Sequence, residues 1–323
     1  MAKTLKNVAE AAGVSAATAS IVLNGRAEGR VSPEVANRVI ATAKELNYRP
    51  NLTARSLRTQ ESKTIGLISD QIATTPFAGQ MLAGAQDVAW RNGWLLLLIN
   101  TEDDKNFEDA ATKALIQRNV DGFIYASMYH REVSIPKTIA DREVVLLDCF
   151  DKAHAFDSVV PSEYKGGRVA TEHLVANGHK KIAHITDSNN SVASPERLRG
   201  FKDVLTENKI AINDSYILSM PGSNSHEGYV MTQKLLALKD RPTAIFAYND
   251  RMAFGAYEAV QEAGLEVGKE ISIIGFDNQP YLADALRPGL TTVQLPHYEM
   301  GAWAAQRMLN QLKNSETNTA MQH

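Results

Sequence analysis

From Thr64 onward, the sequence alternates between short apolar runs and longer amphipathic segments. The apolar runs are 64–69, 94–100, 121–127, 144–148, 181–186, 244–249 and 272–277. The segments with helical periodicity are 78–92, 108–118, 163–177, 196–208, 226–238 and 251–263. Strands that alternate with helices predict a parallel sheet with helices on both faces, and nearly continuous apolar strands predict burial of both faces. Because the runs are too numerous for one sheet of ordinary size, we expect an α/β body of two lobes, each a doubly wound parallel sheet.

The N-terminal region has a different pattern, which predicts three short helices. Thr4 and Ser15 are suitable N-caps for the first two helices, Gly13 separates them, and Ser32 begins a third that ends before Pro50. Helices that cross at small residues predict a helix-turn-helix unit that reads DNA. A three-helix packing unit with a polar outer face is the alternative.

These patterns divide the chain into a head, a linker and a body. The expected boundaries are 1–50 for the head, 51–63 for the linker and 64–323 for the body, with an N-lobe of 64–160 plus 291–312 and a C-lobe of 161–290. Residues 1–63 hold ten Lys and Arg against five Asp and Glu, whereas the remainder holds 24 against 32. A basic head on an acidic body suggests that only the head meets a polyanion.

Composition narrows the class further. The 44% apolar and 22% charged residues are ordinary for a globular protein, and the single cysteine, Cys149, cannot form an intrachain disulfide. The N-terminus lacks the apolar core of a signal peptide, and no apolar run approaches the length of a membrane span, so we expect a cytoplasmic protein with no membrane association. Nucleotide-binding, hydrolase and metal-binding motifs are absent from the sequence, so we expect no cofactor, no metal and no enzymatic activity.

The motif VAEAAGVSAATASIVLNG, followed by VSPEVANRVIATAKELNYRPNLTARSL and TIGLI, resembles the LacI/GalR family of transcriptional regulators. The resemblance extends through the head, the linker and both lobes. Within the family, VSAATASIVLNGR with its extended following loop looks most like regulators of sucrose or related sugar genes. The resemblance implies a periplasmic-binding-protein-like body, a homodimer on near-palindromic double-stranded operator DNA, and a sugar or phosphosugar effector between the lobes.

Candidate DNA contacts lie in the second helix and the loop after it. The hydroxyls of Ser15, Thr18 and Ser20 suit phosphate oxygens, and Ile21 would contact a thymine methyl or nothing. The resemblance places Ala16, Ala17 and Ile21 at base-reading positions, where lac-repressor-like members usually carry polar residues. The full set in this region is Thr4, Ser15, Ala16, Ala17, Thr18, Ser20, Ile21, Asn24, Arg26 and Arg30. Arg26 and Arg30 could equally be solvated loop arginines.

The linker supplies three more candidates, which are Asn51, Arg55 and Leu57. The resemblance implies that this segment forms a short helix on operator DNA and that Leu57 wedges into a base step from the minor groove. A helix of this length is unstable alone but can fold on binding. Packing of Leu57 on the first lobe is the alternative.

Candidate effector contacts follow the apolar runs, since the carboxyl ends of parallel strands form ligand sites. Asp and Asn at these ends can each bind two sugar hydroxyls. The resemblance implies effector positions at Phe77, Asp148, Arg197, Ser223, Asn249 and Asp277, with Ser223 standing where several relatives carry a stacking aromatic.

Structural roles compete with several of these assignments. Asn249 and Asp277 could be helix N-caps, and Asp148 could be a turn residue. Asp70 and Asp250 are better explained as caps or turns than as ligand contacts, and His179 as a structural residue. We interpret Trp90 and Phe254 as core residues.

The sequence therefore predicts a repressor of carbohydrate-utilisation genes that an effector switches by changing the angle between the lobes. The C-terminus lacks leucine heptads, so we expect a dimer. An activator or a global catabolite regulator with a phosphocarrier partner, a solute-binding protein, and a sugar-modifying enzyme using Asp148 or Asp277 as a base are the alternatives.

Overall fold

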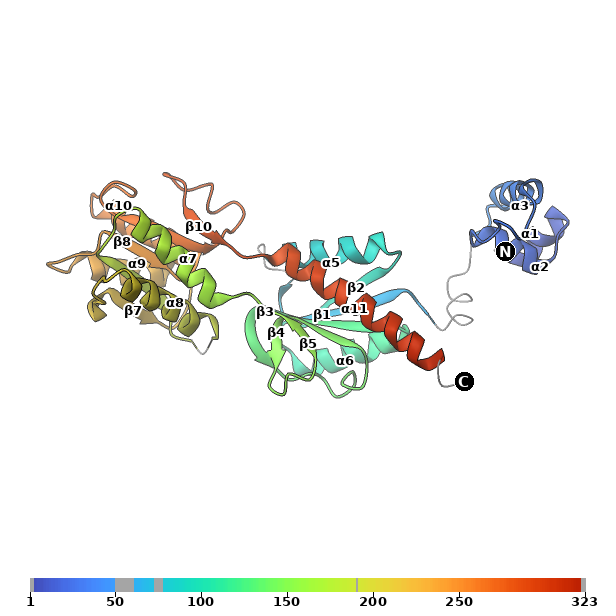
Figure 1. Cartoon of the computed structure of the whole chain (residues 1–323), viewed down its shortest axis with the longest axis horizontal. Helices are drawn as coiled ribbons and strands as arrows, with labels where there is room; N and C mark the ends of the chain where they lie inside the picture. Colours follow the sequence, from blue (N-terminus) through green and yellow to red (C-terminus); the bar gives the residue numbers. More distant parts are fainter. Residues whose placement is uncertain (1–2, 50–60, 73–77, 190, 321–323) are drawn as a thin grey trace. The chain divides into compact units, whose positions relative to one another are not determined.

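The computed structural model describes residues 3–49, 61–72, 78–189 and 191–320. The chain forms two compact units, Met1–Ser62 and Lys63–His323. The second unit contains two five-stranded parallel sheets, each in its own lobe (Figure 1).

The first unit is a three-helix head. Its helices are α1 (Leu5–Ala12), α2 (Ala16–Leu23) and α3 (Pro33–Glu45). The predicted caps are confirmed, because Thr4, Ser15 and Ser32 each accept a hydrogen bond from a backbone amide in the first turn of their helix. Val8, Val39 and other small apolar side chains of the three helices form the core of the head.

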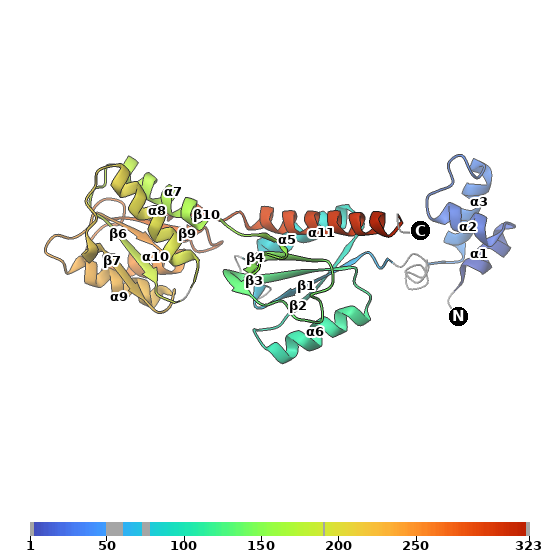
Figure 2. The same ribbon diagram turned by 60° about the horizontal axis from the view of Figure 1, so that its bottom comes forward.

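The N-lobe has a sheet of order β2-β1-β3-β4-β5. Its strands are β1 (Thr64–Ser69), β2 (Leu95–Asn100), β3 (Gly122–Val133), β4 (Val144–Asp151) and β5 (Asp157–Val159), and its helices are α5 (Gly79–Arg91), α6 (Lys105–Gln117) and α11 (His297–Ala320). Helices α5 and α11 cover one face of the sheet and α6 covers the other (Figure 2). The N-lobe therefore has the three-layer arrangement predicted from the sequence.

The C-lobe has a sheet of order β10-β9-β8-β6-β7. Its strands are β6 (Ile182–Asp187), β7 (Ile217–Met220), β8 (Ala244–Ala247), β9 (Ser272–Asp277) and β10 (Thr291–Gln294). Its helices are α7 (Glu163–Ala176), α8 (Ala193–Glu207), α9 (Ser225–Leu236) and α10 (Asp250–Glu262), with a short 3-10 helix at Asp214–Tyr216. Helices α9 and α10 pack on one face of the sheet, and α7 and α8 pack on the other.

Helices pack unusually closely at three places, and glycines permit this. A Cβ on Gly84 of α5 would lie 2.0 Å from the carbonyl oxygen of Tyr298 in α11. The same relation holds between Gly228 of α9 and the carbonyl oxygen of Met252 in α10, at 2.0 Å, and between Gly167 of α7 and the carbonyl oxygen of Arg197 in α8, at 2.3 Å. Each layer of paired helices therefore depends on positions where any side chain larger than hydrogen would separate the pair.

Three expectations differ from the structure. Residues 291–294 form β10, which pairs with β9, so this segment belongs to the C-lobe and not to the N-lobe. Strand β2 lies at the edge of its sheet and is only partly buried, although its sequence is continuously apolar. Trp90 is 73% exposed on α5, so its interpretation as a core residue is wrong, and Phe254 is only partly buried. Apolar patterning cannot separate a core face from an apolar surface.

Candidate functional site

The outer face of the head carries small and hydroxyl-bearing residues. Ala16 and Ala17 are exposed at the start of α2, and Ile21 is partly buried. The Ser15 hydroxyl accepts the Thr18 amide at 3.0 Å, and Asn24 donates through Nδ2 to the Ser20 carbonyl oxygen at 2.6 Å. Ser15 and Asn24 thus cap the two ends of α2, and its first turn carries the small side chains of Ala16 and Ala17.

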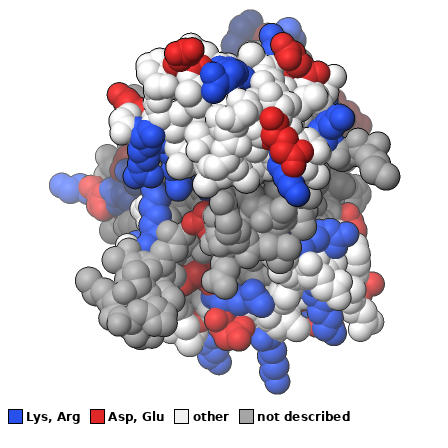
Figure 3. Space-filling model, turned by 90° about the vertical axis from the view of Figure 1, so that its right-hand side faces the viewer, with Lys and Arg blue, Asp and Glu red and all other residues white. Residues whose placement is uncertain are grey.

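The charged residues of the head lie at its periphery. Arg26 and Arg30 are exposed in the loop between α2 and α3, while Arg38 donates to the Ala12 carbonyl oxygen at 3.0 Å and so terminates α1. On the face of the molecule that Figure 3 shows, Lys and Arg side chains are interspersed with Asp and Glu side chains. The linker candidates Asn51, Arg55 and Leu57 lie outside the described residues.

A pocket with an empty volume of about 500 Å³ lies where strand ends of both lobes converge. We call it the cleft pocket. Its polar lining comprises Tyr129, His130, Asp148, Glu163, Ser191, Arg197, Ser223, Tyr248, Asn249, Arg251, Asp277 and His297. Five of the six predicted effector residues are therefore brought together, and the sixth, Phe77, lies outside the described residues.

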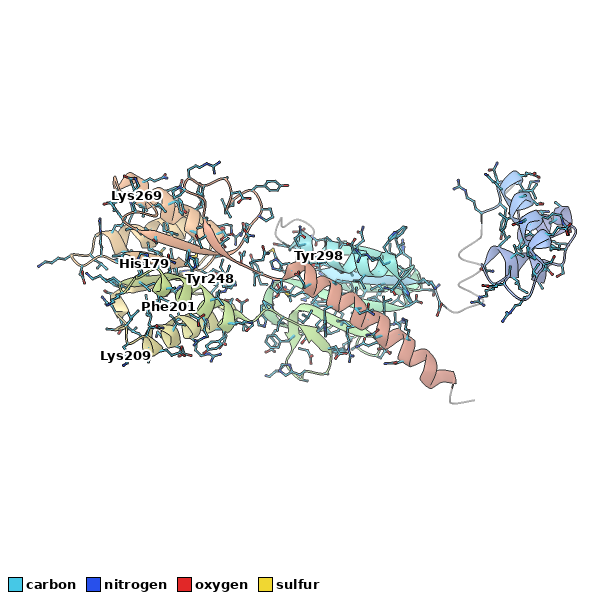
Figure 4. All side chains as sticks on the ribbon, turned by 45° about the horizontal axis from the view of Figure 1, so that its top comes forward. His179, Phe201, Lys209, Tyr248, Lys269 and Tyr298 are labelled. Carbon is cyan, nitrogen blue, oxygen red and sulfur yellow. The ribbon has the colours of Figure 1, made fainter. Side chains whose placement is uncertain are left out.

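Arg197 is the most heavily engaged residue of the cleft pocket. It lies in the second turn of α8, is 4% exposed, and donates to Glu163 at 2.6 Å and to the Tyr248 carbonyl oxygen at 2.5 Å. Its guanidinium also stacks over the ring of Phe276, 3.6 Å from the centroid. Phe201 lies on the same helix as Arg197, and both Phe201 and Tyr248 belong to the C-lobe (Figure 4). A buried arginine held in this way presents a fixed edge to a ligand.

Two carboxylates lie in the cleft pocket without a cationic partner in hydrogen-bond contact. Asp148 lies within β4 and Asp277 ends β9, and their φ values of 56° and 99° fall in a strained region for residues other than glycine. Burial raises the pKa of Asp277 to about 7, although the Arg197 charge opposes this shift. Burial and neighbouring carboxylates raise the pKa of Asp148 as well. Among the described residues, Oδ1 of Asp148 has no hydrogen-bond partner.

The arrangement has the chemistry of a polyhydroxyl-binding site. Buried carboxyl groups from both lobes offer acceptors, and Arg197 offers a donor edge. Buried polar atoms without partners are costly, so hydroxyl groups of a ligand would satisfy them.

Two family descriptions match the chain. Residues 4–51 match bacterial regulatory proteins of the lacI family, and residues 62–322 match the periplasmic binding proteins and sugar binding domain of the LacI family. The chain belongs to the LacI family of bacterial regulatory proteins. It is a DNA-binding transcriptional regulator with a sugar-binding type of body.

Individual LacI-family relatives cover nearly the whole chain. The ribose operon repressor of Haemophilus influenzae is 34% identical, over 98% of this chain and 93% of that protein. The transcriptional repressor PurR of Vibrio vulnificus is 32% identical, over 97% of this chain and 93% of that protein. The lac repressor dimer bound to operator and the anti-inducer ONPF has a TM-score of 0.79 and 29% identity, over 97% of this chain and 94% of that one.

The structure assigns definite contacts to residues that the sequence left open. Asn249 is the N-cap of α10: its Oδ1 accepts the Met252 amide at 2.8 Å, and its Nδ2 donates to the Ser223 carbonyl oxygen at 3.0 Å. Asp250 accepts the Gln279 amide at 2.6 Å and the Thr292 hydroxyl at 2.6 Å. Asn249 thus ties α10 to the Ser223 loop, while Asp250 ties it to the β9 and β10 ends.

His179 has the structural role predicted from the sequence, whereas Asp70, expected to be a cap or turn residue, instead bridges two strands. Asp70 accepts the Met128 amide at 2.9 Å and an Arg131 nitrogen at 2.8 Å, which joins the end of β1 to the second half of β3. His179 bonds the Thr243 hydroxyl at 2.9 Å and the Ser272 hydroxyl at 3.0 Å. It therefore locks the amino ends of the C-lobe strands, opposite the cleft pocket of this LacI-family body.

Sequence reasoning missed several members of the cleft pocket. His130 lies in the continuation of β3 beyond its apolar run, and Glu163 begins α7 just after the chain crosses between lobes. Burial lowers the pKa of His130, and it lowers the pKa of His297 to about 4. A search at the crossovers as well as at the strand ends would have found Glu163 and His297.

In the part of the chain that the structure describes, no helix has the length and apolarity needed to cross a membrane. The same residues contain no group of three His, Cys, Asp or Glu side chains that could hold a metal ion.

Proposed function

We propose that this LacI-family chain is a cytoplasmic, homodimeric repressor of carbohydrate-utilisation genes, released from or recruited to near-palindromic operator DNA by a sugar-type effector, and without enzymatic activity. The cleft pocket carries this proposal. It places Asp148 of the N-lobe opposite Arg197 and Asp277 of the C-lobe, so one ligand would contact both lobes. The relatives named as a ribose operon repressor and as the transcriptional repressor PurR are consistent with such a regulator.

The switch would follow from differential binding. A ligand shifts an equilibrium between two lobe arrangements only by the difference in its affinity for them. A full switch from 1:99 to 99:1 requires about 5.5 kcal/mol. Hydrogen bonds from a ligand to Asp148, Asp277 and Arg197, made together in only one arrangement, have the size to supply this difference.

An apolar surface supports the proposed homodimer. Trp90 of α5 is 73% exposed, and Leu95 and Leu98 of β2 are 50% and 37% exposed. Exposed apolar groups of this size mark interaction surfaces. Two heads joined through the bodies would read the two halves of a near-palindromic operator. Sedimentation should give a dimer, and a stable tetramer at low concentration would contradict this.

Selection from random duplex DNA tests the proposal directly. The purified full chain should enrich a near-palindromic site, and its affinity should fall steeply with salt, as expected for phosphate contacts. Adding sugars or sugar derivatives should change that affinity, and the sugar should be recovered unchanged after long incubation. Failure to enrich any sequence, with and without sugars, would refute the regulator. Turnover of the sugar would favour an enzyme, and sugar binding without DNA binding would favour a solute-binding protein.

A further inference from the structure

Arg251 is a second arginine in the lining of the cleft pocket, and its environment differs from that of Arg197. It lies in the first turn of α10 and donates to the Ser223 hydroxyl at 3.3 Å. Its Nε is buried and has no hydrogen-bond partner among the described residues. Arg197, in contrast, is paired with the buried Glu163 carboxylate and also donates to the Tyr248 carbonyl oxygen.

No carboxylate compensates Arg251 within the described part of the chain. Among the described residues, Arg251 forms no ion pair with a nitrogen–oxygen distance of 4.0 Å or less, although its neighbour Asp250 is acidic. The oxygens of Asp250 are directed to Thr292 and Gln279. A positive charge in the first turn of a helix is also unfavourable, because the amino end of the helix dipole is itself positive. An anion bound beside this guanidinium would therefore be stabilised both by the Arg251 charge and by the positive amino end of α10.

Ser223 completes the arrangement. Its backbone is held by Asn249 at 3.0 Å, and its hydroxyl is the contact of Arg251, so the loop before α9 and the start of α10 are fixed relative to each other. The serine side chain is small, which leaves room in the pocket beside the guanidinium. A hydroxyl and a guanidinium presented together are suitable donors for phosphate or carboxylate oxygens.

We propose that the effector is an anionic sugar derivative whose phosphate or carboxylate group is bound by Arg251 and Ser223. This inference rests on the proposed function of the cleft pocket and specifies the ligand that the pocket takes. The sugar hydroxyls would face Asp148 and Asp277, and the anionic group would lie at the α10 end of the pocket. The carboxyl groups of the pocket would thus bind the sugar hydroxyls, and the Arg251 and Ser223 donors would bind the anionic group of the same ligand.

Matched pairs of sugars test the proposal by calorimetry on the full chain. The pairs are ribose with ribose 5-phosphate, glucose with glucose 6-phosphate, and fructose with its 1- and 6-phosphates, while gluconate and glucuronate test carboxylates. At least one anionic member should bind about tenfold or more tightly than its neutral partner, as expected for a charge-assisted contact. Whether the phosphates or the sugar acids show this preference identifies the anionic group.

Variants assign the preference to Arg251. Arg251→Gln should reduce the ratio of anionic to neutral affinity to about one, and Arg251→Lys should keep part of it. Arg241→Gln is the matched control, since Arg241 is an exposed arginine of the same lobe paired with Glu270, and it should keep the full ratio. If Arg251→Gln fails to fold, Ser223→Phe keeps the charge but fills the space beside it, and it should abolish the ratio as well.

The outcomes separate this inference from the proposed function. If a neutral sugar binds as tightly as its anionic partner and changes operator affinity, the regulator stands and the anion site is refuted. An unchanged ratio in both Arg251→Gln and Ser223→Phe refutes the anion site in the same way. If no sugar of either kind binds or changes operator affinity, both proposals fail.

Discussion

The head and the cleft pocket are built in opposite ways. In the head, Ser15 bonds Thr18 and Asn24 bonds Ser20, so the predicted contact residues that make hydrogen bonds find partners no more than four positions away. In the pocket, Arg197 bonds Glu163 across 34 positions and Asn249 bonds the Ser223 loop across 26. The head is thus encoded locally and exposed, whereas the pocket is assembled from distant, buried charges.

This difference predicts where substitutions act. A contact residue of the head can change with little effect on the rest of the molecule, because its structural partner is local. A pocket residue cannot, because burial makes each charge depend on a partner from another element. Function and stability should therefore be separable in the head and coupled in the body.

Arg197→Met should have the largest effect. It leaves the Glu163 carboxylate buried without its partner, and breaking a buried pair costs about 3–5 kcal/mol. Urea unfolding of the body, followed by circular dichroism, should show a loss of this order together with loss of effector binding. Arg199→Met is the matched control on the same helix, with a 53% exposed side chain paired with Glu196, and should cost less than about 1 kcal/mol. Equal losses of unfolding free energy in the two variants would contradict the distinction between buried charges of the pocket and exposed charges.

Asp277→Asn should change the pH dependence of body stability. The folded protein holds the Asp277 proton up to about pH 7, whereas the unfolded chain releases it near its ordinary pKa of 3.8. The native state binds more protons between these values, so this carboxyl makes the free energy of unfolding fall as pH rises through that window. Asparagine does not titrate. The variant should therefore gain on the wild type from about pH 4 to about pH 7, by about 4 kcal/mol.

Urea titrations at several pH values check this sign. The buried histidines His184 and His297 contribute in the opposite direction, but they are present in both proteins and cancel in the difference. Asp284→Asn changes an exposed aspartate of the loop after β9 and serves as the control. A variant whose advantage is constant or falls with rising pH would show that Asp277 is ionised in the folded protein.

The fold was predictable where local pattern and packing agree. The runs that became β1, β4, β6, β8 and β9 are apolar because both faces of these strands are covered. β10 was missed as a C-lobe strand because TTVQ is partly exposed at the sheet edge and carries little apolar signal. Trp90 was misinterpreted because an exposed apolar face on α5 has the same helical periodicity as a core face.

The site was predictable only in part, for a related reason. Asp148 and Asp277 could be found because each ends an apolar run of the sequence, and the topology of a parallel sheet places ligand contacts near the carboxyl ends of its strands. Arg251 and Glu163 could not be recognised, because their importance lies in which groups they meet: Glu163 pairs with Arg197, and Arg251 meets only Ser223 among the described hydrogen bonds. Partnership across distant elements is a property of the folded chain.

Ser15→Ala should have the smallest of these effects and should confine it to the head. The Ser15 hydroxyl accepts the Thr18 amide at 3.0 Å, and loss of such an N-cap costs about 1 kcal/mol. Hydrogen exchange of the full chain should show faster exchange in α2, weaker operator binding, and unchanged protection of the body. Ala11→Ser, on the exposed face of α1, is the control and should leave α2 unchanged. Faster exchange in the body sheets would show that the head and the body are energetically coupled, and the local encoding of the head would then be refuted.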